Sequence, residues 1–101
     1  MIDYQTLIKK YCEGNSNLEH ILLTHSRQVA DRAMAIVSAH PEWVESGEID
    51  PVFVEEAAML HDIGVVLCDA PKICCFGTHA YIEHGYLGAE ILRQEGLPKH
   101  A

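Results

Sequence analysis

Apolar residues recur at helical intervals along nearly the whole chain, and this spacing limits the fold to packed helices. The longest such segment runs from Leu18 to about Ala39, with apolar residues three or four positions apart. This interval places them on one side of an α-helix, which must bury that side against a partner. The apolar stripe consists of Leu18, Ile21, Leu22, Val29, Ala33, Ile36 and Val37.

Capping signals delimit three further helices. Gly14-Asn15 ends a first helix over residues 2–13, and Ser16 or Asn17 can cap the long one. Asp50 as N-cap and Pro51 at the first helical position start a helix that runs to about Ile63 and stops at Gly64. A last helix covers residues 80–95 and ends at Gly96.

The segments between these helices are expected to be loops. Residues 41–50 are polar and acidic, and residues 65–79 contain Pro71 and Gly77. The run Val65-Val66-Leu67 resembles a strand, but no partner strand is evident. We therefore predict an all-α protein, a helical bundle or orthogonal array, with residues 1–101 as a single domain.

The charge balance excludes some partners. With 7 Lys and Arg against 15 Asp and Glu, the net charge is −8, which argues against docking on nucleic acid or anionic lipid. No apolar run approaches the ~20 residues of a membrane span, and the N-terminus lacks the pattern of a signal peptide. We expect a cytoplasmic protein.

The four cysteines do not form a recognisable framework. Cys74 and Cys75 are adjacent, Cys12 and Cys68 lie far from them, and no C-x-x-C pair occurs. A zinc site of Cys68, Cys74, Cys75 and His79 is therefore disfavoured against known zinc spacings. We expect reduced, mostly buried thiols.

Three histidines lie on the apolar faces of three predicted helices, and a carboxylate follows one of them. They are His25, His61 and His84, with Asp62 beside His61. A buried histidine needs a hydrogen-bond partner or a metal. One alone is most often a satisfied core residue, but three with a carboxylate favour a divalent metal site.

The order of these residues resembles a known family. His61-Asp62-Ile63-Gly64 is similar to the signature of the HD-domain metal-dependent phosphohydrolases, specifically the HDIG subgroup. His25 matches the upstream helical histidine of that family, and the segment around His84 resembles the stretch that carries an extra histidine in two-metal members. The resemblance covers about residues 16–98.

The resemblance implies a mechanism and a ligand set. His25, His61 and Asp62 would hold a first divalent ion, with Asp62 as the catalytic, bridging carboxylate. His84 would hold a second ion or face the substrate. The one or two ions could be Mn, Fe, Co, Ni, Zn or Mg, and the substrate would be a small nucleotide or phosphate ester.

Other polar residues have weaker assignments. Val65 stands where some relatives place a phosphate-contacting Lys, so Lys72 is a substitute candidate, although a solvated loop lysine is slightly favoured. His79 could donate to the substrate or be an ordinary surface residue. Arg27 could reach a phosphate or pair with Asp31 four residues on. His100 is expected to be a tail histidine.

A rival interpretation is non-enzymatic. The closing Asp of the family is absent, and Pro98 could begin a further helix three residues before the end, so the chain is expected to be cut short. A truncated or degenerate domain would act as a helical interaction or regulatory module. It would expose apolar surface and form a homo-oligomer.

Overall fold

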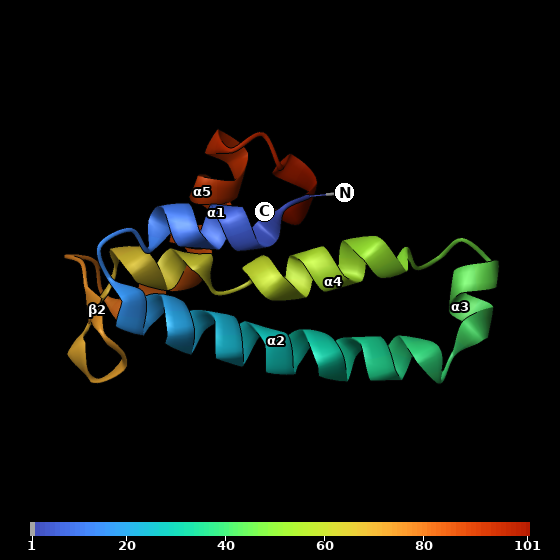
Figure 1. Cartoon of the computed structure of the whole chain (residues 1–101). Coiled ribbons are helices and arrows are strands. Elements are labelled where there is room, and N and C mark those ends of the chain that lie inside the picture. The colour runs from blue at the N-terminus through green and yellow to red at the C-terminus, as the bar shows by residue number, and fades with distance from the viewer. Residues whose placement is uncertain (1) are drawn as a thin grey trace.

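Two long helices form the base of the molecule in the computed structural model, which describes residues 2–101. Helix α2 (Ser16–Ser38) and helix α4 (Pro51–Leu60) lie side by side and make the most extensive contact in the fold (Figure 1). Asp50 caps α4 by accepting from the backbone N–H of Val52, with Pro51 at the first helical position, as predicted. The prediction of an all-α protein is confirmed.

Helix α1 (Tyr4–Tyr11) packs on both α2 and α4. Asp3 caps it by accepting from the N–H of Thr6, and Gly14 turns the chain with φ +79°. The predicted cap of α2 is wrong: Asn15, not Ser16 or Asn17, accepts from the N–H of Leu18. The Asn15 side chain also donates to the carbonyl of Cys74, which ties this turn to a distant loop.

The connection between α2 and α4 differs from the expected loop. Residues Pro41–Glu45 form a short helix, α3, at the far end of the α2–α4 pair (Figure 1). Pro41 is at its first position, where a missing N–H costs nothing. The proline that was expected to mark only the exit from α2 therefore also starts a new helical turn.

Helix α4 ends at Leu60, three residues earlier than predicted. Asp62 leaves the helical region with φ −106° and ψ 12°, and a 3-10 helix, η1 (Ile63–Leu67), follows. Gly64 therefore does not stop the helix: it lies inside η1, buried, and its φ is not positive. His61 and Asp62 occupy the junction between the two elements.

The segment after η1 contains a small hairpin that the sequence did not indicate. Strand β1 (Asp69–Ala70) pairs antiparallel with β2 (Cys75–Phe76), and η2 (Pro71–Ile73) connects them. Cys74 closes the turn in the left-handed region, with φ 62°. The prediction that Val65-Val66-Leu67 is not a strand is confirmed, because these residues lie in η1. The two-residue strands that do form lie in the segment expected to be a loop, and they are too short for alternation to reveal them.

The last predicted helix is divided in two. A 3-10 turn, η3 (Tyr81–Glu83), leads directly into α5 (His84–Gln94), which packs on η1. Gly96 ends this region with φ +80°, as predicted from its position. The chain continues as one further 3-10 turn, η4 (Pro98–His100).

The core lies between α1, α2, α4, η1 and α5 and includes Ile8, Leu22, Leu60, Ile63 and Ile91. The predicted stripe of α2 is only partly buried. Ile21 is 36% exposed and Ile36 is 52% exposed, whereas Ser26 is completely buried. The buried side of α2 is thus rotated toward Leu22, Ser26 and Ala30.

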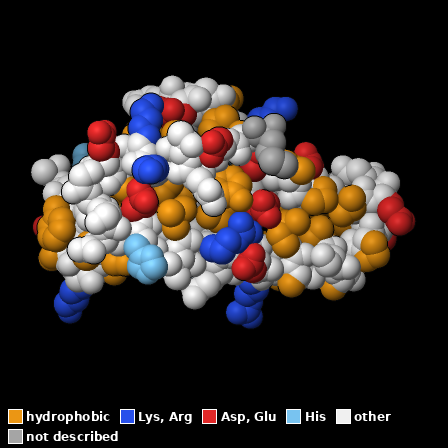
Figure 2. Space-filling view, in the orientation of Figure 1, with side chains coloured by type: hydrophobic (Ala, Val, Ile, Leu, Met, Phe, Trp, Pro, Cys, Tyr) orange, Lys and Arg blue, Asp and Glu red, His pale blue; other side chains and the backbone are white. Residues whose placement is uncertain are grey.

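Charged side chains of both signs are distributed over the surface. On the face shown in Figure 2, basic side chains are scattered among acidic and hydrophobic ones. Cys12, Cys68 and Cys75 are buried free thiols, and burial raises the pKa of the Cys12 thiol to about 11. No helix within residues 2–101 is long and apolar enough to cross a membrane.

Candidate metal centre

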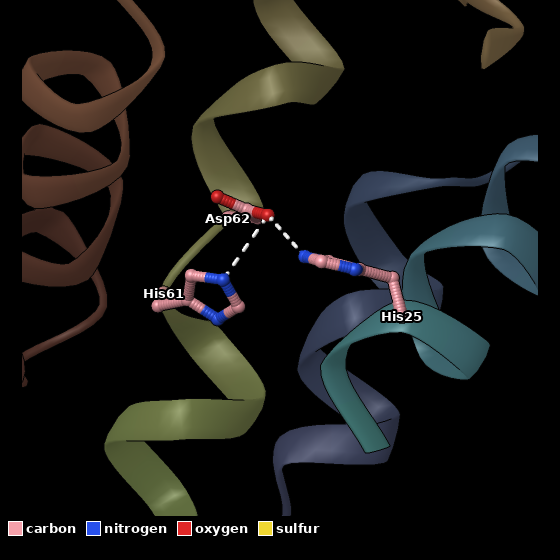
Figure 3. Close-up of side chains that lie close together, drawn as sticks. All are labelled: His25, His61 and Asp62. Carbon is pink, nitrogen blue, oxygen red and sulfur yellow. Dashed lines mark ion pairs between the residues drawn. The ribbon is translucent and has the colours of Figure 1, made fainter. Parts of the chain in front are cut away.

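Three side chains that could hold a metal meet where α4 ends beside the middle of α2. His25 comes from α2, and His61 and Asp62 come from the α4–η1 junction (Figure 3). Asp62 Oδ2 lies 3.0 Å from His25 Nε2 and 3.1 Å from His61 Nε2. Two ligand atoms that are each about 2.1 Å from one ion, at 90–109°, are about 3.0–3.4 Å apart. The spacing of the cluster therefore fits one divalent ion.

His84 adds a fourth side chain to the same carboxylate. Its Nε2 lies 3.4 Å from Asp62 Oδ1, the oxygen that His25 and His61 do not face. Asp62 thus presents one oxygen to two histidines and the other oxygen to the third. This is the arrangement that a bridging carboxylate between two ions requires.

Two histidines are held in one tautomer by backbone carbonyls. His61 Nδ1 lies against the carbonyl of Ala58, and His84 Nδ1 lies 2.7 Å from the carbonyl of Tyr81. A carbonyl oxygen only accepts, so each Nδ1 carries the proton and donates. In a neutral ring, Nε2 then carries a lone pair, and it is Nε2 that faces Asp62.

The consequence is a set of lone pairs that point at one another. The Asp62 carboxylate is an acceptor, and so are the Nε2 atoms of neutral His61 and His84. These acceptors approach to 3.1 and 3.4 Å, which is unfavourable unless a proton or a metal ion lies between them. A metal ion satisfies all of them at once, and histidines that donate their second N–H to a carbonyl are typical metal ligands.

Sequence reasoning did not identify these two carbonyls. Ala58 and Tyr81 are each three residues before the histidine they orient. Ala58 lies in the last turn of α4 and Tyr81 begins η3, so both carbonyls lie within one turn of a helix end. A histidine three residues after such a position is the pattern that could have revealed them.

A close backbone contact sets the position of His84. Gly64 in η1 packs so tightly on α5 that a Cβ atom there would overlap the carbonyl oxygen of His84 and the backbone nitrogen of Gly88. Only glycine permits this approach. The fourth residue of the His-Asp-Ile-Gly motif therefore brings α5, and with it His84, up to Asp62.

The expectation that the histidines are buried on apolar faces is wrong. The side chain of His25 is 51% exposed, that of His61 37% and that of His84 27%, while Asp62 is 18% exposed. Ser26 occupies the buried position of α2 that the sequence suggested for His25. The cluster therefore lies at the surface, where a substrate can reach it.

The other candidates lie outside the cluster. His79 pairs with Glu83 at 3.6 Å, and its backbone bonds to Leu67 and Asp69. Lys72 is exposed on η2. Their roles toward a substrate stay predictions.

Arg27 points to acidic partners in the structure. It donates to Asp31 at 2.9 Å, as the alternative in the sequence suggested, and to Glu55 at 3.3 Å and Tyr4 at 3.2 Å. These contacts use one N–H on each of the three guanidinium nitrogens, and a role of Arg27 toward a phosphate stays a prediction.

His100 is not a solvated tail residue. Its side chain is only 10% exposed, packs against Phe53 and lies 3.2 Å from a carboxylate oxygen of Glu56. Glu56 is itself buried and accepts from the backbone N–H of Ile2 at 2.7 Å. The expectation for His100 was therefore wrong, although it was correctly left out of the metal site.

Comparison with known proteins identifies the family. The HD domain matches residues 22–100, which is most of the chain. The chain therefore belongs to the HD-domain family, whose members are generally metal-dependent phosphohydrolases. No curated protein and no solved structure matches the chain significantly. The family match does not distinguish the HDIG subgroup.

Proposed function

We propose that this protein is a metal-dependent phosphohydrolase that acts on a small phosphorylated substrate. The observation that carries the proposal is that the Nε2 lone pairs of His61 and His84, in their neutral form, face the carboxylate of Asp62, with His25 Nε2 beside the same carboxylate. This geometry is costly without a cation and favourable with one. Family membership supplies the class of reaction.

The donor set suggests how the ions are held. His25, His61 and Oδ2 of Asp62 would bind the first ion, and His84 with Oδ1 would contribute to a second. Imidazole and carboxylate ligands suit Mn, Fe, Co, Ni or Zn, and Mg is also compatible with the carboxylate. The carbonyls of Ala58 and Tyr81 fix two of the rings before any ion binds, which lowers the entropic cost of binding.

A bound ion and the side chains of the protein would have different roles in hydrolysis. A bound divalent ion lowers the pKa of a coordinated water and polarises the phosphoryl group. Asp62 sets the geometry of the centre because both of its oxygens are engaged. The half-exposed ring of His25 leaves one side of the cluster open to substrate. With a net charge of −8, the protein disfavours long polyanions, which supports a small substrate.

The test is metal binding measured together with hydrolysis. The protein is stripped with a chelator and titrated with Mn²⁺ by calorimetry, and hydrolysis is then assayed on generic phosphomonoesters, phosphodiesters and nucleotides. We expect binding of Mn²⁺ and Mn²⁺-dependent hydrolysis, with both lost in His61→Ala. His20→Ala is the matched control, since His20 is an exposed histidine on the same helix as His25.

Two results would overturn the proposal. One is that the wild-type protein binds neither Mn²⁺ nor any of Fe²⁺, Co²⁺, Ni²⁺, Zn²⁺ and Mg²⁺ in the same titration. The other is hydrolysis that survives unchanged in both His61→Ala and Asp62→Ala.

A further inference from the structure

A pocket of about 240 Å³ adjoins the metal-binding cluster, and His25 and Asp62 form part of its wall. The pocket is therefore continuous with the proposed reaction centre. The remaining lining comes from α2, from η1, from the hairpin turn and from η3. These residues are Leu18, Ile21, Leu22, Val65, Ile73 and Tyr81.

The chemistry of the wall is apolar. Five of the six remaining residues are aliphatic, and Tyr81 adds an aromatic ring. As far as residues 2–101 show, neither Lys, Arg, Asn nor Gln lines the pocket. Of the six remaining residues, only Tyr81 carries a hydrogen-bonding side-chain group, its hydroxyl. A nucleobase or sugar there would lose more hydrogen bonds to water than one hydroxyl can replace, which is unfavourable for each buried polar group left without a partner.

Two of the wall residues are more exposed than their side chains favour. Ile21 is 36% exposed and Tyr81 is 48% exposed, although both are large and hydrophobic. An apolar group in the pocket would cover part of this surface and gain about 25 cal/mol per Å² of apolar area removed from water. A ligand with such a group would thus cover apolar side chains that the fold leaves exposed to water.

Tyr81 also connects the pocket with the cluster. Its carbonyl accepts from His84 Nδ1, and its ring lies 4.6 Å from the His84 ring, centre to centre. One residue therefore both lines the pocket and orients a predicted metal ligand. A group bound against Tyr81 is held next to the reaction centre.

We propose that this pocket binds the apolar alkyl or aryl group of a phosphate ester whose phosphate lies at the His–Asp cluster. The inference rests on the proposed phosphohydrolase function and narrows its substrate to esters of apolar alcohols, in preference to nucleotides and sugar phosphates. The size is adequate, because an apolar cavity of about 150 Å³ holds a benzene ring.

The experiment separates binding from hydrolysis. Methyl-, butyl-, hexyl- and phenylphosphonate, which cannot be hydrolysed, are titrated into the Mn²⁺-loaded protein by calorimetry, with ribose 5-phosphate and AMP for comparison. We expect affinity to rise by about threefold to fourfold per methylene group that enters the pocket. Hydrolysis of hexyl and phenyl phosphate is measured in parallel with that of ribose 5-phosphate and AMP.

Paired variants test the location. Ile21→Glu places a charge in the pocket wall and should abolish the dependence on chain length. Ile36→Glu is the matched control: Ile36 is an exposed isoleucine of the same helix, about 22 Å farther along it at 1.5 Å per residue, and the dependence should persist. Ile21→Ala, which adds no charge, is the second variant in case Ile21→Glu does not fold. It should weaken the dependence of affinity on chain length.

The outcomes distinguish the two proposals. Affinity that is independent of chain length, or a preference for AMP or ribose 5-phosphate, overturns the pocket assignment while leaving the phosphohydrolase function in place. An unchanged chain-length dependence in both Ile21 variants overturns it as well. Chain-length-dependent binding without hydrolysis of any ester supports the pocket and overturns the phosphohydrolase function.

Discussion

The carbonyl oxygen of His84 lies where a side chain on Gly64 would begin. Two residues twenty positions apart are thus in backbone contact, and the contact places the ring of His84 beside Asp62 at 3.4 Å. The glycine of the His-Asp-Ile-Gly segment is consequently a packing residue. Its absent side chain lets α5 approach Asp62 and the histidines beside it.

Gly64→Ala should therefore lower the stability of the protein and its affinity for Mn²⁺. The added methyl group overlaps backbone atoms, which cannot rotate away, so we expect a loss of about 1–3 kcal/mol in the free energy of unfolding and weaker Mn²⁺ binding. Gly85→Ala is the control, because a Cβ at Gly85 meets nothing within 4 Å. There, replacement of glycine in a helix should stabilise by about 0.5–1 kcal/mol. Urea unfolding measures both, and equal stability of the two variants would contradict this account.

Asp62→Asn should separate stability from metal binding. In chelator, the amide can donate to a histidine Nε2 that now faces only an acceptor, so we expect the free energy of unfolding to rise by about 1 kcal/mol. With Mn²⁺ present, the variant should lose the stabilisation that the ion gives the wild-type protein. Thermal unfolding with and without Mn²⁺ measures both effects. A variant that is less stable in chelator would argue against the lone-pair geometry.

Glu56→Gln should remove a pH-dependent part of the stability. The N–H of Ile2, with a smaller contribution from His100, holds the pKa of Glu56 below its ordinary value of 4.5. A lowered pKa means that the contribution is fully present above pH 4.5 and is lost as pH falls through the lower, folded-state pKa. We expect the variant to lose about 1–3 kcal/mol at pH 7 and to show a flatter stability profile below pH 4.5.

The control for Glu56→Gln is Glu13→Gln, which makes the same change of charge at an exposed position. Its stability should stay within about 0.5 kcal/mol of the wild-type value at pH 7. Urea unfolding between pH 3 and 7 measures both variants. Identical pH profiles for wild type and Glu56→Gln would show that Glu56 carries no such linkage.

Ser26→Ala should stabilise the protein. The Ser26 hydroxyl is completely buried on α2 and finds no hydrogen-bond partner among the described residues. Its removal should recover about 1–2 kcal/mol of desolvation cost. Ser38→Ala, at an exposed position of the same helix, reports the gain from helix propensity alone, up to about 0.7 kcal/mol. A Ser26→Ala protein no more stable than Ser38→Ala would mean that the hydroxyl does have a partner.

Local signals predicted the helices well because their causes are local. The apolar spacing of α2, the Asp50-Pro51 start of α4 and the glycine at position 96 each act within one turn of helix. Shorter elements escaped prediction. The helix at Pro41–Glu45 and the two-residue strands are too short for periodicity to appear. The hairpin is in addition tied to a distant segment by the hydrogen bond from Asn15 to the carbonyl of Cys74.

Burial was harder to predict than helicity. The stripe of α2 contained both Ile21 and His25 as candidates for the core, yet both are exposed, whereas Ser26, which was not in the stripe, is completely buried. The spacing of apolar residues shows roughly which side of a helix is buried, but it does not distinguish between neighbouring residues at the edge of that side. Which residue faces the core depends on how α4 and α1 pack on α2.

The sequence by itself indicated that the chain is helical, predicted His25, His61, Asp62 and His84 as candidate metal ligands, and pointed to the HD-domain family. Only the tertiary structure decided that one carboxylate serves three histidines from three segments, with opposite oxygens for His25 and His84. The reason is physical. Helix formation depends on residues within four positions of one another, whereas the metal-binding geometry depends on where separate helices pack, and there on the missing side chain of Gly64.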